Sequence, residues 1–397
     1  MRRPAVTRPP PTGGSPGAVS ASLGVVPLPC LMMRGGTSRG AFFNAADLPA
    51  DPAARDRVLI AAMGSPHPLQ VDGIGGGNPL TSKVAIVGPP SDPRADVDYL
   101  FAQVSVDRAL VDTKAACGNI LTAVGPFAVE TGLVATRSPF TTVRIHNVNT
   151  GTLTLATLST PDGRLRYDGD QVMAGCATPS APIRLSFVDA AGGMTGRLLP
   201  TGEAREEIDG IPVSLVDYAI PVMIVEAKRL GITGQETAAE IDANRALLDR
   251  VEALRLVAGQ RMGLGDVSRS VTPKVALVSR ARNGGTIASR YLMPWRCHTA
   301  HAVTGALCLT AATRLAGSVA AAVARRPAGP QVEIEHPAGT LSVEVEGSGE
   351  RLTTSVVRTA RLLFAGQVYV PEAAFRSEAD DRHDARFTVA AATAFAE

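Results

Sequence analysis

A thiol and an amine in this sequence stand where each could act as an acid or a base. Cys117 opens an apolar helical segment as Cys117-Gly118-Asn119, and the positive end of a helix dipole favours the thiolate form of such a cysteine. Lys83 heads an apolar strand, where desolvation disfavours the ammonium form of the amine. Two such groups can remove a proton from one carbon and return it to another. On these residues alone, a buried small side chain and a lysine that extends to water stay open as structural alternatives.

The sequence also offers groups that hold carboxylates. The helix that starts at Cys117 has free backbone N–H groups in its first turn, and Gly118 lets a ligand approach them. A polar turn after an apolar strand contains Arg34-Gly35-Gly36, with two hydroxyl residues following, and the guanidinium can bind a carboxylate through two hydrogen bonds. These features favour a small acidic ligand, although an isolated turn of this kind is by default a surface turn.

Composition and missing motifs exclude several other functions. The sequence contains 39 basic and 37 acidic residues, a balance that favours no nucleic-acid partner, and it has no apolar run long enough to cross a membrane. It lacks the P-loop and nucleophile-elbow motifs, and the glycine run at 73–78 precedes a strand rather than a helix. Five scattered cysteines without a CxxC pair indicate reduced thiols. We predict a cytoplasmic protein that works without a cofactor.

An internal duplication organises the chain of 397 residues, which is long enough for two domains. Three segments recur in the same order: TSKVAIV (81–87) as TPKVALV (272–278), a cysteine-led apolar helix at 117–133 and again at 297–315, and VRIHNVNTGTLTL (143–155) as VEIEHPAGTLSVEV (332–345). A weaker match joins 29–36 to 220–227. The alternating segments predict strands and the all-round apolar segments predict buried helices. One buried helix wrapped in a curved sheet in each half satisfies both signals.

Seven segments resemble the PrpF family: LMMRGGTSRGAFF (31–43), DGIGGGNPLTSKVAIV (72–87), DVDYLFAQV (96–104), CGNILTAVGPFAVETGLV (117–134), MGLGDVS (262–268), PWRCHTAHAVTGA (294–306) and VVRTARLLFAGQVYV (356–370). Within that family the sequence is most similar to the 4-oxalomesaconate tautomerases and Δ-isomerases. The resemblance implies an α/β (α+β) fold of two pseudosymmetric domains like those of diaminopimelate epimerase, each a β-barrel-like sheet around a central helix. We expect a flexible extension at 1–24, a first domain at 25–205 and a second at 206–397, whose last strand can pack back on the first.

The resemblance also implies a site between the two domains. Lys83 and Cys117 are its expected catalytic pair. The expected substrate-binding residues are Arg34, Gly36, Thr37, Ser38, Ser82, Gly118 and Asn119 from the first domain, with Arg296, His298, Thr304 and Gly305 from the second. The implied reaction is a proton shift in an unsaturated tricarboxylic acid, with 4-oxalomesaconate as the expected substrate.

Three other functions stay open at this point. One is the cis–trans isomerisation of 2-methylaconitate through the same intermediate, and another is polycarboxylate binding without catalysis, which needs neither a thiol nor a lysine. The third is a two-thiol amino-acid racemase or epimerase, in which Cys297 would open the second helix as Cys117 opens the first. His298 and His301 would then share a helix face beside Cys297, but zinc spacing recurs nowhere else, so we predict no metal. The oligomeric state is open, and a homo-oligomer is compatible with the sequence.

Overall fold

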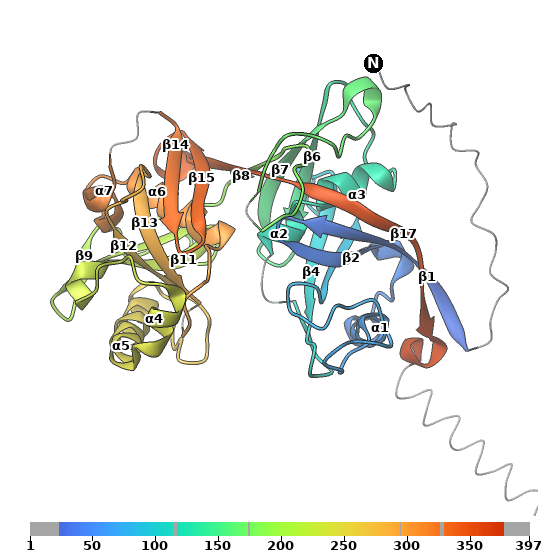
Figure 1. Cartoon of the computed structure of the whole chain (residues 1–397), viewed down its shortest axis with the longest axis horizontal. Helices are drawn as coiled ribbons and strands as arrows, with labels where there is room; N and C mark the ends of the chain where they lie inside the picture. Colours follow the sequence, from blue (N-terminus) through green and yellow to red (C-terminus); the bar gives the residue numbers. More distant parts are fainter. Residues whose placement is uncertain (1–23, 114–116, 174, 294, 326–328, 377–397) are drawn as a thin grey trace, which may run out of the picture.

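A computed structural model describes residues 24–113, 117–173, 175–293, 295–325 and 329–376, and these form two lobes (Figure 1). The expected extension at 1–24 lies outside the described residues except for Gly24. The strands of the first lobe are Val25–Gly35 (β1), Ser38–Asn44 (β2), Lys83–Gly88 (β3), Val97–Val104 (β4), Val111–Asp112 (β5), Phe140–Asn147 (β6), Thr152–Ser159 (β7) and Ile183–Val188 (β8). Its helices are Pro52–Met63 (α1), Gly118–Leu121 (α2) and Val124–Glu130 (α3).

The second lobe repeats this composition of elements. Its strands are Glu206–Ile208 (β9), Ile211–Tyr218 (β10), Ile220–Glu226 (β11), Lys274–Ser279 (β12), Ile287–Leu292 (β13), Gln331–His336 (β14), Gly339–Glu346 (β15) and Thr353–Arg358 (β16). Its helices are Ala238–Ala243 (α4), Arg245–Arg261 (α5), Val303–Thr313 (α6) and Val319–Val323 (α7). The last described strand, Ala360–Pro371 (β17), leaves the second lobe and lies beside β1 of the first (Figure 1).

The two lobes share one strand topology. In the first lobe β2 pairs in parallel with β3, β3 pairs antiparallel with β4, and β4 pairs in parallel with β6. Strands β11, β12, β13 and β14 repeat these three pairings in the second lobe. Antiparallel pairing of β8 with β16 joins the lobes into one mixed sheet. Lys274 is therefore the first residue of β12, the position that Lys83 has in β3.

The weak sequence match between 29–36 and 220–227 is wrong by one strand. β11 pairs in parallel with β12 and is followed by helices before that strand, as β2 is followed by α1 before β3. β11 is therefore the counterpart of β2, and β10 is the counterpart of β1. The error arose because β1, β10 and β11 are all apolar strands, and an apolar alternation does not identify which strand of a sheet it belongs to.

Both faces of β3 are covered, which explains why its sequence is apolar throughout. Ala85 and Val87 face the cluster that contains α2 and α3, whereas Val84 and Ile86 face the cluster that contains α1. In the second lobe β12 divides its side chains in the same way between a cluster around α6 and one around α4 and α5. A strand covered on both sides reads as a continuous apolar run rather than an alternation.

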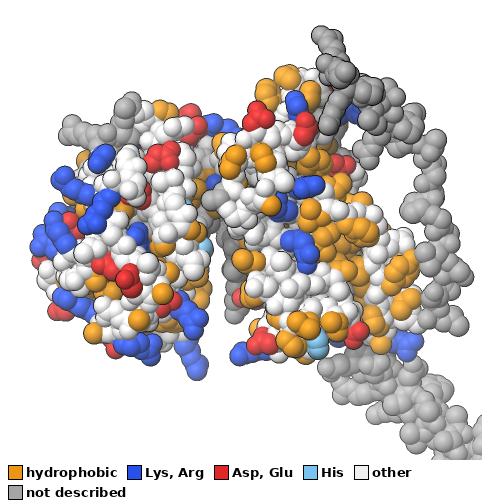
Figure 2. Space-filling model, viewed as in Figure 1, with side chains coloured by type: hydrophobic (Ala, Val, Ile, Leu, Met, Phe, Trp, Pro, Cys, Tyr) orange, Lys and Arg blue, Asp and Glu red, His pale blue; other side chains and the backbone are white. Residues whose placement is uncertain are grey.

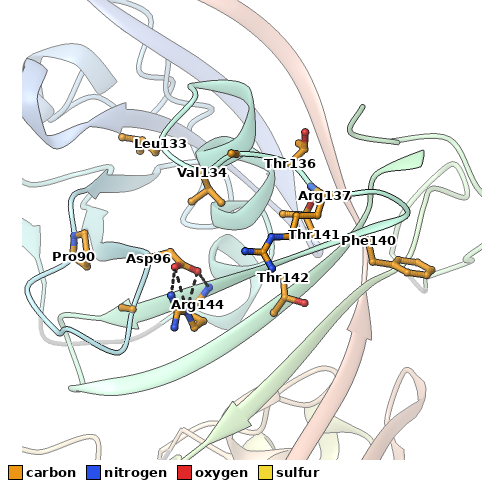
Figure 3. A pocket seen from close by; sticks show the side chains of 12 residues that line it. Pro90, Asp96, Leu133, Val134, Thr136, Arg137, Phe140, Thr141, Thr142 and Arg144 are labelled. Carbon is orange, nitrogen blue, oxygen red and sulfur yellow. Dashed lines mark hydrogen bonds and ion pairs between the residues drawn. The ribbon is translucent and has the colours of Figure 1, made fainter. Parts of the chain in front are cut away.

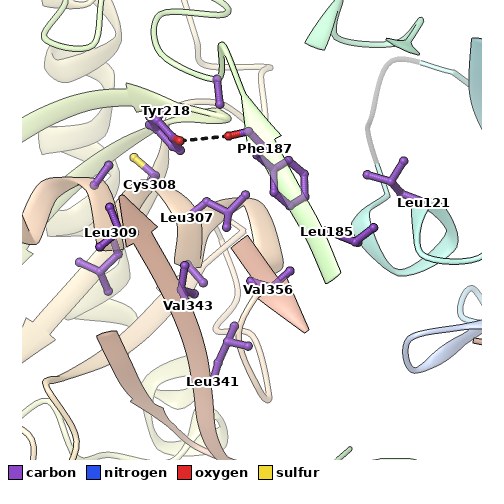
Figure 4. Packing of buried hydrophobic residues seen from close by; sticks show 14 of the residues in the cluster. Leu121, Leu185, Phe187, Tyr218, Leu307, Cys308, Leu309, Leu341, Val343 and Val356 are labelled. Carbon is purple, nitrogen blue, oxygen red and sulfur yellow. Dashed lines mark hydrogen bonds between the residues drawn. The ribbon is translucent and has the colours of Figure 1, made fainter. Parts of the chain in front are cut away.

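One hydrophobic cluster runs through both lobes and contains α6 in the second. Leu307, Cys308 and Leu309 of α6 are buried among Val343 of β15 and Val356 of β16 (Figure 4). A buried leucine of this kind contributes roughly 1.5–3 kcal/mol. The same cluster includes residues of α2 in the first lobe, so the two central helices are anchored to one core. The buried helix expected in the second half is α6, whereas the one expected in the first half is divided into α2 and α3 at residues 122–123.

β17 is paired with β1 on one side. Figure 2 shows that hydrophobic side chains gather on the face of the first lobe that these two strands cross. Leu363 and Phe364 of β17 are exposed there. In the register, Met32 pairs with Phe364 and Met33 with Leu362, so Leu363 is the extra residue of a β-bulge. Within the described ranges, no helix is long and apolar enough to cross a membrane.

Candidate active site

Lys83 lies at the edge of the first lobe's core with its amine held by two neighbours. It is 9% exposed, and its Nζ donates a hydrogen bond of 2.7 Å to Gln103 Oε1. The same Nζ lies 5.0 Å from the centre of the Phe101 ring, within the range of a cation–π contact. Since side chains alternate along a strand, Lys83 points to the face of β3 that Ala85 and Val87 share with α2.

Gln103 fixes the start of β3 as well as the amine. Its Nε2 donates to the carbonyl oxygens of Ser82 at 2.7 Å and Pro79 at 3.2 Å, while its Oε1 accepts from Lys83. Sequence reasoning did not select Gln103, although it lies in the DVDYLFAQV segment. The signal that could have identified it is its place on β4, the strand that pairs with the strand of Lys83.

Ser82, expected in the substrate-binding set, is fully buried and already paired. Its Oγ donates to the carbonyl oxygen of Val104 at 2.9 Å and accepts from Gln70 Nε2 at 2.7 Å. The side chain thus anchors the loop before β3 against β4. Direct binding of substrate by this hydroxyl does not follow from its geometry, and we treat Ser82 as a residue that positions Lys83.

Cys117 is the N-cap residue of α2 and is half-buried. Its thiol makes no capping hydrogen bond, while its carbonyl oxygen accepts from Leu121 N at 3.0 Å and from the Tyr99 hydroxyl at 3.3 Å. The Tyr99 ring is fully buried beneath this turn. The backbone of the cysteine is therefore fixed by the core, and its thiol has no hydrogen-bond partner among the described residues.

Three of the described α-helices begin without a side-chain cap, namely α2, α3 and α6, and the starts of α2 and α6 lie against each other. The N-cap of α6 is Ala302, which has no side chain that could accept a hydrogen bond. By contrast α1, α4, α5 and α7 begin with capping side chains, from Asp51, Thr237, Asn244 and Ser318 respectively. Uncapped first-turn N–H groups with a positive dipole end favour bound anions.

The turn between β1 and β2 packs on the start of α2. Asn119 Nδ2 donates to Thr37 Oγ1 at 3.1 Å and to Ser38 Oγ at 3.4 Å. Gly36 has φ +53°, and a Cβ there would lie 2.2 Å from Asn119 Oδ1, so glycine is required both by the conformation and by the contact. The structure thus brings the predicted residues Gly36, Thr37, Ser38 and Asn119 together beside Cys117.

Arg34, predicted to bind a carboxylate, is engaged in holding this turn. Its Nη1 donates to Gly36 O at 2.9 Å and to both the carbonyl and hydroxyl oxygens of Thr359 at 3.0 Å. Its Nη2 donates to Ser180 Oγ at 3.2 Å. Gly36 N in turn donates to Thr359 O at 3.0 Å. The guanidinium ties the first lobe to the segment that connects β16 with β17. Arg34 therefore contributes to the site by holding the turn in place.

The second central helix begins six residues later than Cys297, the cysteine predicted to open it. α6 starts at Val303, directly against α2, because an ideal Cβ on Gly118 would lie 3.2 Å from Val303 Cβ. Thr304 lines a small cleft together with Gly118, and Gly305 lies against the ring of Tyr291. These two predicted residues therefore do reach the region where the lobes meet.

Cys297 does not occupy the position expected of a second catalytic thiol. It precedes α6, pairs with Leu292 in an isolated bridge, and is 5% exposed within the cluster around α4 and α5. Its N–H donates to Asp242 Oδ1 at 2.7 Å. Burial, with the nearby Asp242 carboxylate, raises the pKa of the Cys297 thiol to about 11. The counterpart of Cys117 in the repeat is therefore Ala302.

The two histidines predicted on one helix face lie in the irregular segment before α6. His298 is half-buried, its N–H donates to Tyr291 O at 2.7 Å, and burial lowers the pKa of its ring. His301 is buried with Nε2 at 3.1 Å from Ser289 Oγ, and burial lowers its pKa to about 3. Among the described residues, no three His, Cys, Asp or Glu side chains are arranged to hold a metal ion.

Arg296 is the predicted residue that the structure leaves apart from the others. Its side chain is exposed, and its carbonyl oxygen closes a turn with Met293 N at 2.9 Å. The preceding Trp295 lies against Arg255 of α5. This places the segment on the α5 side of the second lobe, where the described contacts do not join it to α2.

A separate pocket of about 770 Å³ lies in the first lobe, between β6, the segment that follows α3 and the loop before β4 (Figure 3). Arg144 lines it and pairs with Asp96, with a shortest distance of 2.6 Å. None of the predicted site residues lines it; its lining residues are Pro90, Ala95, Asp96, Leu133, Val134, Ala135, Thr136, Arg137, Phe140, Thr141, Thr142 and Arg144.

Comparisons with known proteins identify the family of this chain and agree with its fold. The chain is 51% identical to YbhH of Escherichia coli (strain K12) over 347 residues, which are 87% of this chain and 99% of that protein. It is 47% identical to a (4E)-oxalomesaconate Delta-isomerase of Novosphingobium sp. (strain KA1), over 86% of this chain and 97% of that protein.

The solved structure of a methylitaconate-delta-isomerase is also similar, with a TM-score of 0.83 and 36% identity over 90% of this chain and 98% of that one. The fold and its relatives define an isomerase with a large mixed sheet. The chain belongs to the PrpF family, whose description "PrpF protein" matches residues 25–371. The family resemblance and the enzyme class predicted from the motifs are confirmed.

Proposed function

We propose that this protein is a cofactor-independent isomerase that shifts a proton within an unsaturated tricarboxylic acid, with 4-oxalomesaconate as the substrate. The observation that carries the proposal is the joint placement of two acid–base groups. Lys83 points to the face of β3 that α2 covers, and Cys117 starts α2 with its thiol unused in capping. Polycarboxylate binding alone would require neither group.

The packing of α2 links the two groups. Gly40 of β2 pairs with Lys83, and an ideal Cβ on Gly40 would lie 3.0 Å from the Cδ1 atom of Ile120 in α2. Tyr99 of β4 supports the Cys117 carbonyl from the same side of the sheet. Neighbouring strands of one rigid sheet thus hold the amine and the thiol, as acid–base catalysis at two carbons requires.

In the proposed reaction one of these groups removes a proton from a carbon next to the conjugated system. The negative charge spreads into a dienolate, which the carboxylate-binding N–H groups at the helix starts stabilise. The other group delivers a proton to a different carbon, so the double bond moves and the atoms of the substrate are conserved. Gly36, Thr37, Ser38 and Asn119 would hold carboxylates beside Cys117.

Identity supports oxalomesaconate as the substrate class. The 47% identity to the (4E)-oxalomesaconate Delta-isomerase spans nearly the whole of both chains, whereas a 2-methyl-aconitate isomerase of Shewanella oneidensis is 35% identical. The placement of Cys297 away from the helix start disfavours a two-thiol racemase. We also propose the diaminopimelate-epimerase type of fold, with domains at 25–205 and 206–397, and a cytoplasmic location, since all five cysteines are free thiols.

A labelling experiment tests this function. A panel of unsaturated tricarboxylates, including 4-oxalomesaconate and 2-methylaconitate, is incubated with enzyme in deuterated water and followed by NMR. We expect deuterium to enter 4-oxalomesaconate at the carbon that gains the proton, at a rate that greatly exceeds that of the other acids. Faster labelling of 2-methylaconitate would show that this acid, and not 4-oxalomesaconate, is the substrate. No labelling of any acid would refute the proposal. An amino acid that exchanges its α-proton would indicate a racemase.

A further inference from the structure

The proposed function uses none of the residues around the large pocket of the first lobe (Figure 3). The volume of this pocket, about 770 Å³, is within the range of sites for small molecules. Pro90, Leu133 and Val134 are apolar parts of its wall, while three threonines and three charged residues supply the polar parts. An apolar wall combined with a few charged groups is typical of a site for a small organic ion.

The charges that line this pocket do not cancel. Arg144 and Asp96 neutralise each other, since Arg144 Nη2 lies 2.6 Å from Oδ1 of the acid and Arg144 N donates to its Oδ2 at 2.8 Å. The hydrogen bonds from Arg144 hold the pKa of Asp96 below its ordinary value, against the effect of burial, so the carboxylate stays ionised. Arg137 is the third charged residue of the lining, and its guanidinium has no ion pair or hydrogen bond among the described residues. One positive charge is therefore left without a counter-ion.

The backbone of Arg137 is held in place by two buried threonines. Arg137 N donates to Thr141 Oγ1 at 2.9 Å, and the carbonyl oxygen of Arg137 lies within hydrogen-bond distance of the hydroxyls of Thr141 and Thr160. From this fixed point the side chain extends toward Arg144 and is exposed to the solvent of the pocket (Figure 3). A guanidinium on an anchored backbone loses less freedom on binding an anion than one on a mobile loop.

We propose that this pocket binds a small organic monocarboxylate, with its carboxylate on Arg137 and its apolar body against Leu133 and Val134. The two oxygens of a carboxylate match two N–H groups of a guanidinium, and one negative charge balances the one positive charge that the lining leaves uncompensated. The pocket is separate from the proposed active site, because none of the residues expected to bind the substrate lines it. The inference therefore does not depend on the proposed reaction.

Binding of a fluorinated acid tests the pocket without relying on turnover. Fluorine NMR titrations of the full chain compare 4-fluorobenzoate with 4-fluorobenzamide, which has the same apolar body and no charge. We expect the wild-type protein to bind the benzoate about tenfold more tightly than the amide. Arg137→Gln should remove this difference by weakening the benzoate alone, because one charge-assisted pair is lost. Arg108→Gln, an exposed arginine at the opposite end of β4 from Asp96, is the matched control and should change neither affinity.

A second variant should change the affinity in the opposite direction. Asp96→Asn removes the negative charge of the lining but keeps an oxygen that can accept from Arg144 N, so two guanidinium groups are left without a counter-ion. We expect this variant to bind 4-fluorobenzoate about three- to tenfold more tightly than the wild-type protein does. Disruption of the pocket would weaken binding instead, so the sign of the change separates the two causes. Thermal melting checks that each variant folds.

Several results would overturn the proposal. A wild-type protein that does not bind 4-fluorobenzoate, or that binds the amide equally well, would show that no carboxylate site is present. An unchanged affinity in folded Arg137→Gln would place the bound acid elsewhere, for example at the helix starts. An unchanged or weaker affinity in folded Asp96→Asn would show that the charge of this lining does not control binding.

Discussion

Gly118 and Val303, the first residues of α2 and α6, meet where the two lobes join. An ideal Cβ on Gly118 would lie 3.2 Å from Val303 Cβ, which is tighter than most real contacts of this kind. Each helix is held from behind by the shared hydrophobic cluster, so neither can retreat without disturbing that core. The two helix starts can therefore lie this close together because residue 118 is a glycine and has no Cβ atom.

Substituting this glycine should change catalysis more than stability. In Gly118→Ala the new methyl group pushes the helix starts apart by a few tenths of an ångström, and we expect kcat/KM to fall about tenfold, because reacting groups must be positioned closely. Val303→Ala in the same chain removes the obstruction and should restore most of the activity. Steady-state kinetics on the two single variants and the double variant measure the coupling, and purely additive effects would contradict the proposed contact.

The two cysteines should differ in their importance. Cys117→Ser replaces the thiol with a hydroxyl that is a much weaker acid, so turnover should fall by about 10² to 10⁴. Cys297→Ser should keep most of the turnover and lose about 1 kcal/mol of stability, since a buried apolar site receives a hydroxyl. Initial rates and urea unfolding of both variants provide the comparison. The reverse order of the two rates would show that the catalytic thiol is Cys297.

Loss of the Gln103 side chain should mainly reduce kcat. In Gln103→Leu the Lys83 amine loses its acceptor at 2.7 Å and the loop before β3 loses two hydrogen bonds. We expect kcat to fall 10- to 100-fold with KM changed by less than threefold, because the amine is misoriented while the carboxylate sites are intact. Gln367→Leu, on exposed β17, is the matched control. A change confined to KM would argue that Gln103 binds substrate instead.

His301 should make the protein less stable in mild acid. Burial lowers its pKa to about 3 in the folded state, whereas the unfolded chain has the ordinary value near 6.5. As the pH falls through 6.5, the unfolded state gains a proton that the folded state does not, so about 2 kcal/mol is lost between pH 7 and pH 5. Urea unfolding at both pH values should show that His301→Gln reduces this loss by the same amount. An equal loss in both proteins would place the titrating group elsewhere.

Chelation should leave the enzyme active. The described residues contain no cluster of His, Cys, Asp or Glu with the arrangement of a metal site, and the proposed proton transfers use only the lysine and the thiol. Dialysis against EDTA, followed by initial-rate measurements, should therefore give unchanged kcat. Activity that disappears and returns with zinc would instead implicate a metal.

Local pattern predicted the elements that carry Lys83 and Cys117 because apolar periodicity and a helix start are local properties. The start of α6 was placed too early because the repeat alignment matched Cys297 to Cys117. The backbone at 297–298 is held by partners that sequence spacing does not reveal: Asp242 for Cys297 N, and the Tyr291 carbonyl oxygen for His298 N. Ala302, without a capping side chain, gave no sign that the helix begins beside it.

Long-range contacts account for the other differences. Arg34 looks like a free anion-binding residue in the sequence, but its partner Thr359 is 325 residues away. Gln103 and Ser82 were separated by 21 residues, yet the register of β3 with β4 places them together. Such pairings depend on strand register, which the amino-acid pattern of a single strand does not determine when both of its faces are buried.

The pairing of β1 with β17 has a consequence for how this protein is made. Val25 pairs with Pro371, and Arg34 with Arg361, so β1, the first described strand, pairs with β2 early but gains β17 on its other side only when nearly all of the described chain has been synthesised. Contacts of such high sequence separation form late and slowly. The turn at Gly36, which lies beside Cys117, is held by hydrogen bonds to Thr359. That residue is synthesised directly before β17. A nascent chain therefore carries Lys83 and Cys117 for most of translation before β17, the last described strand, is available to close onto β1.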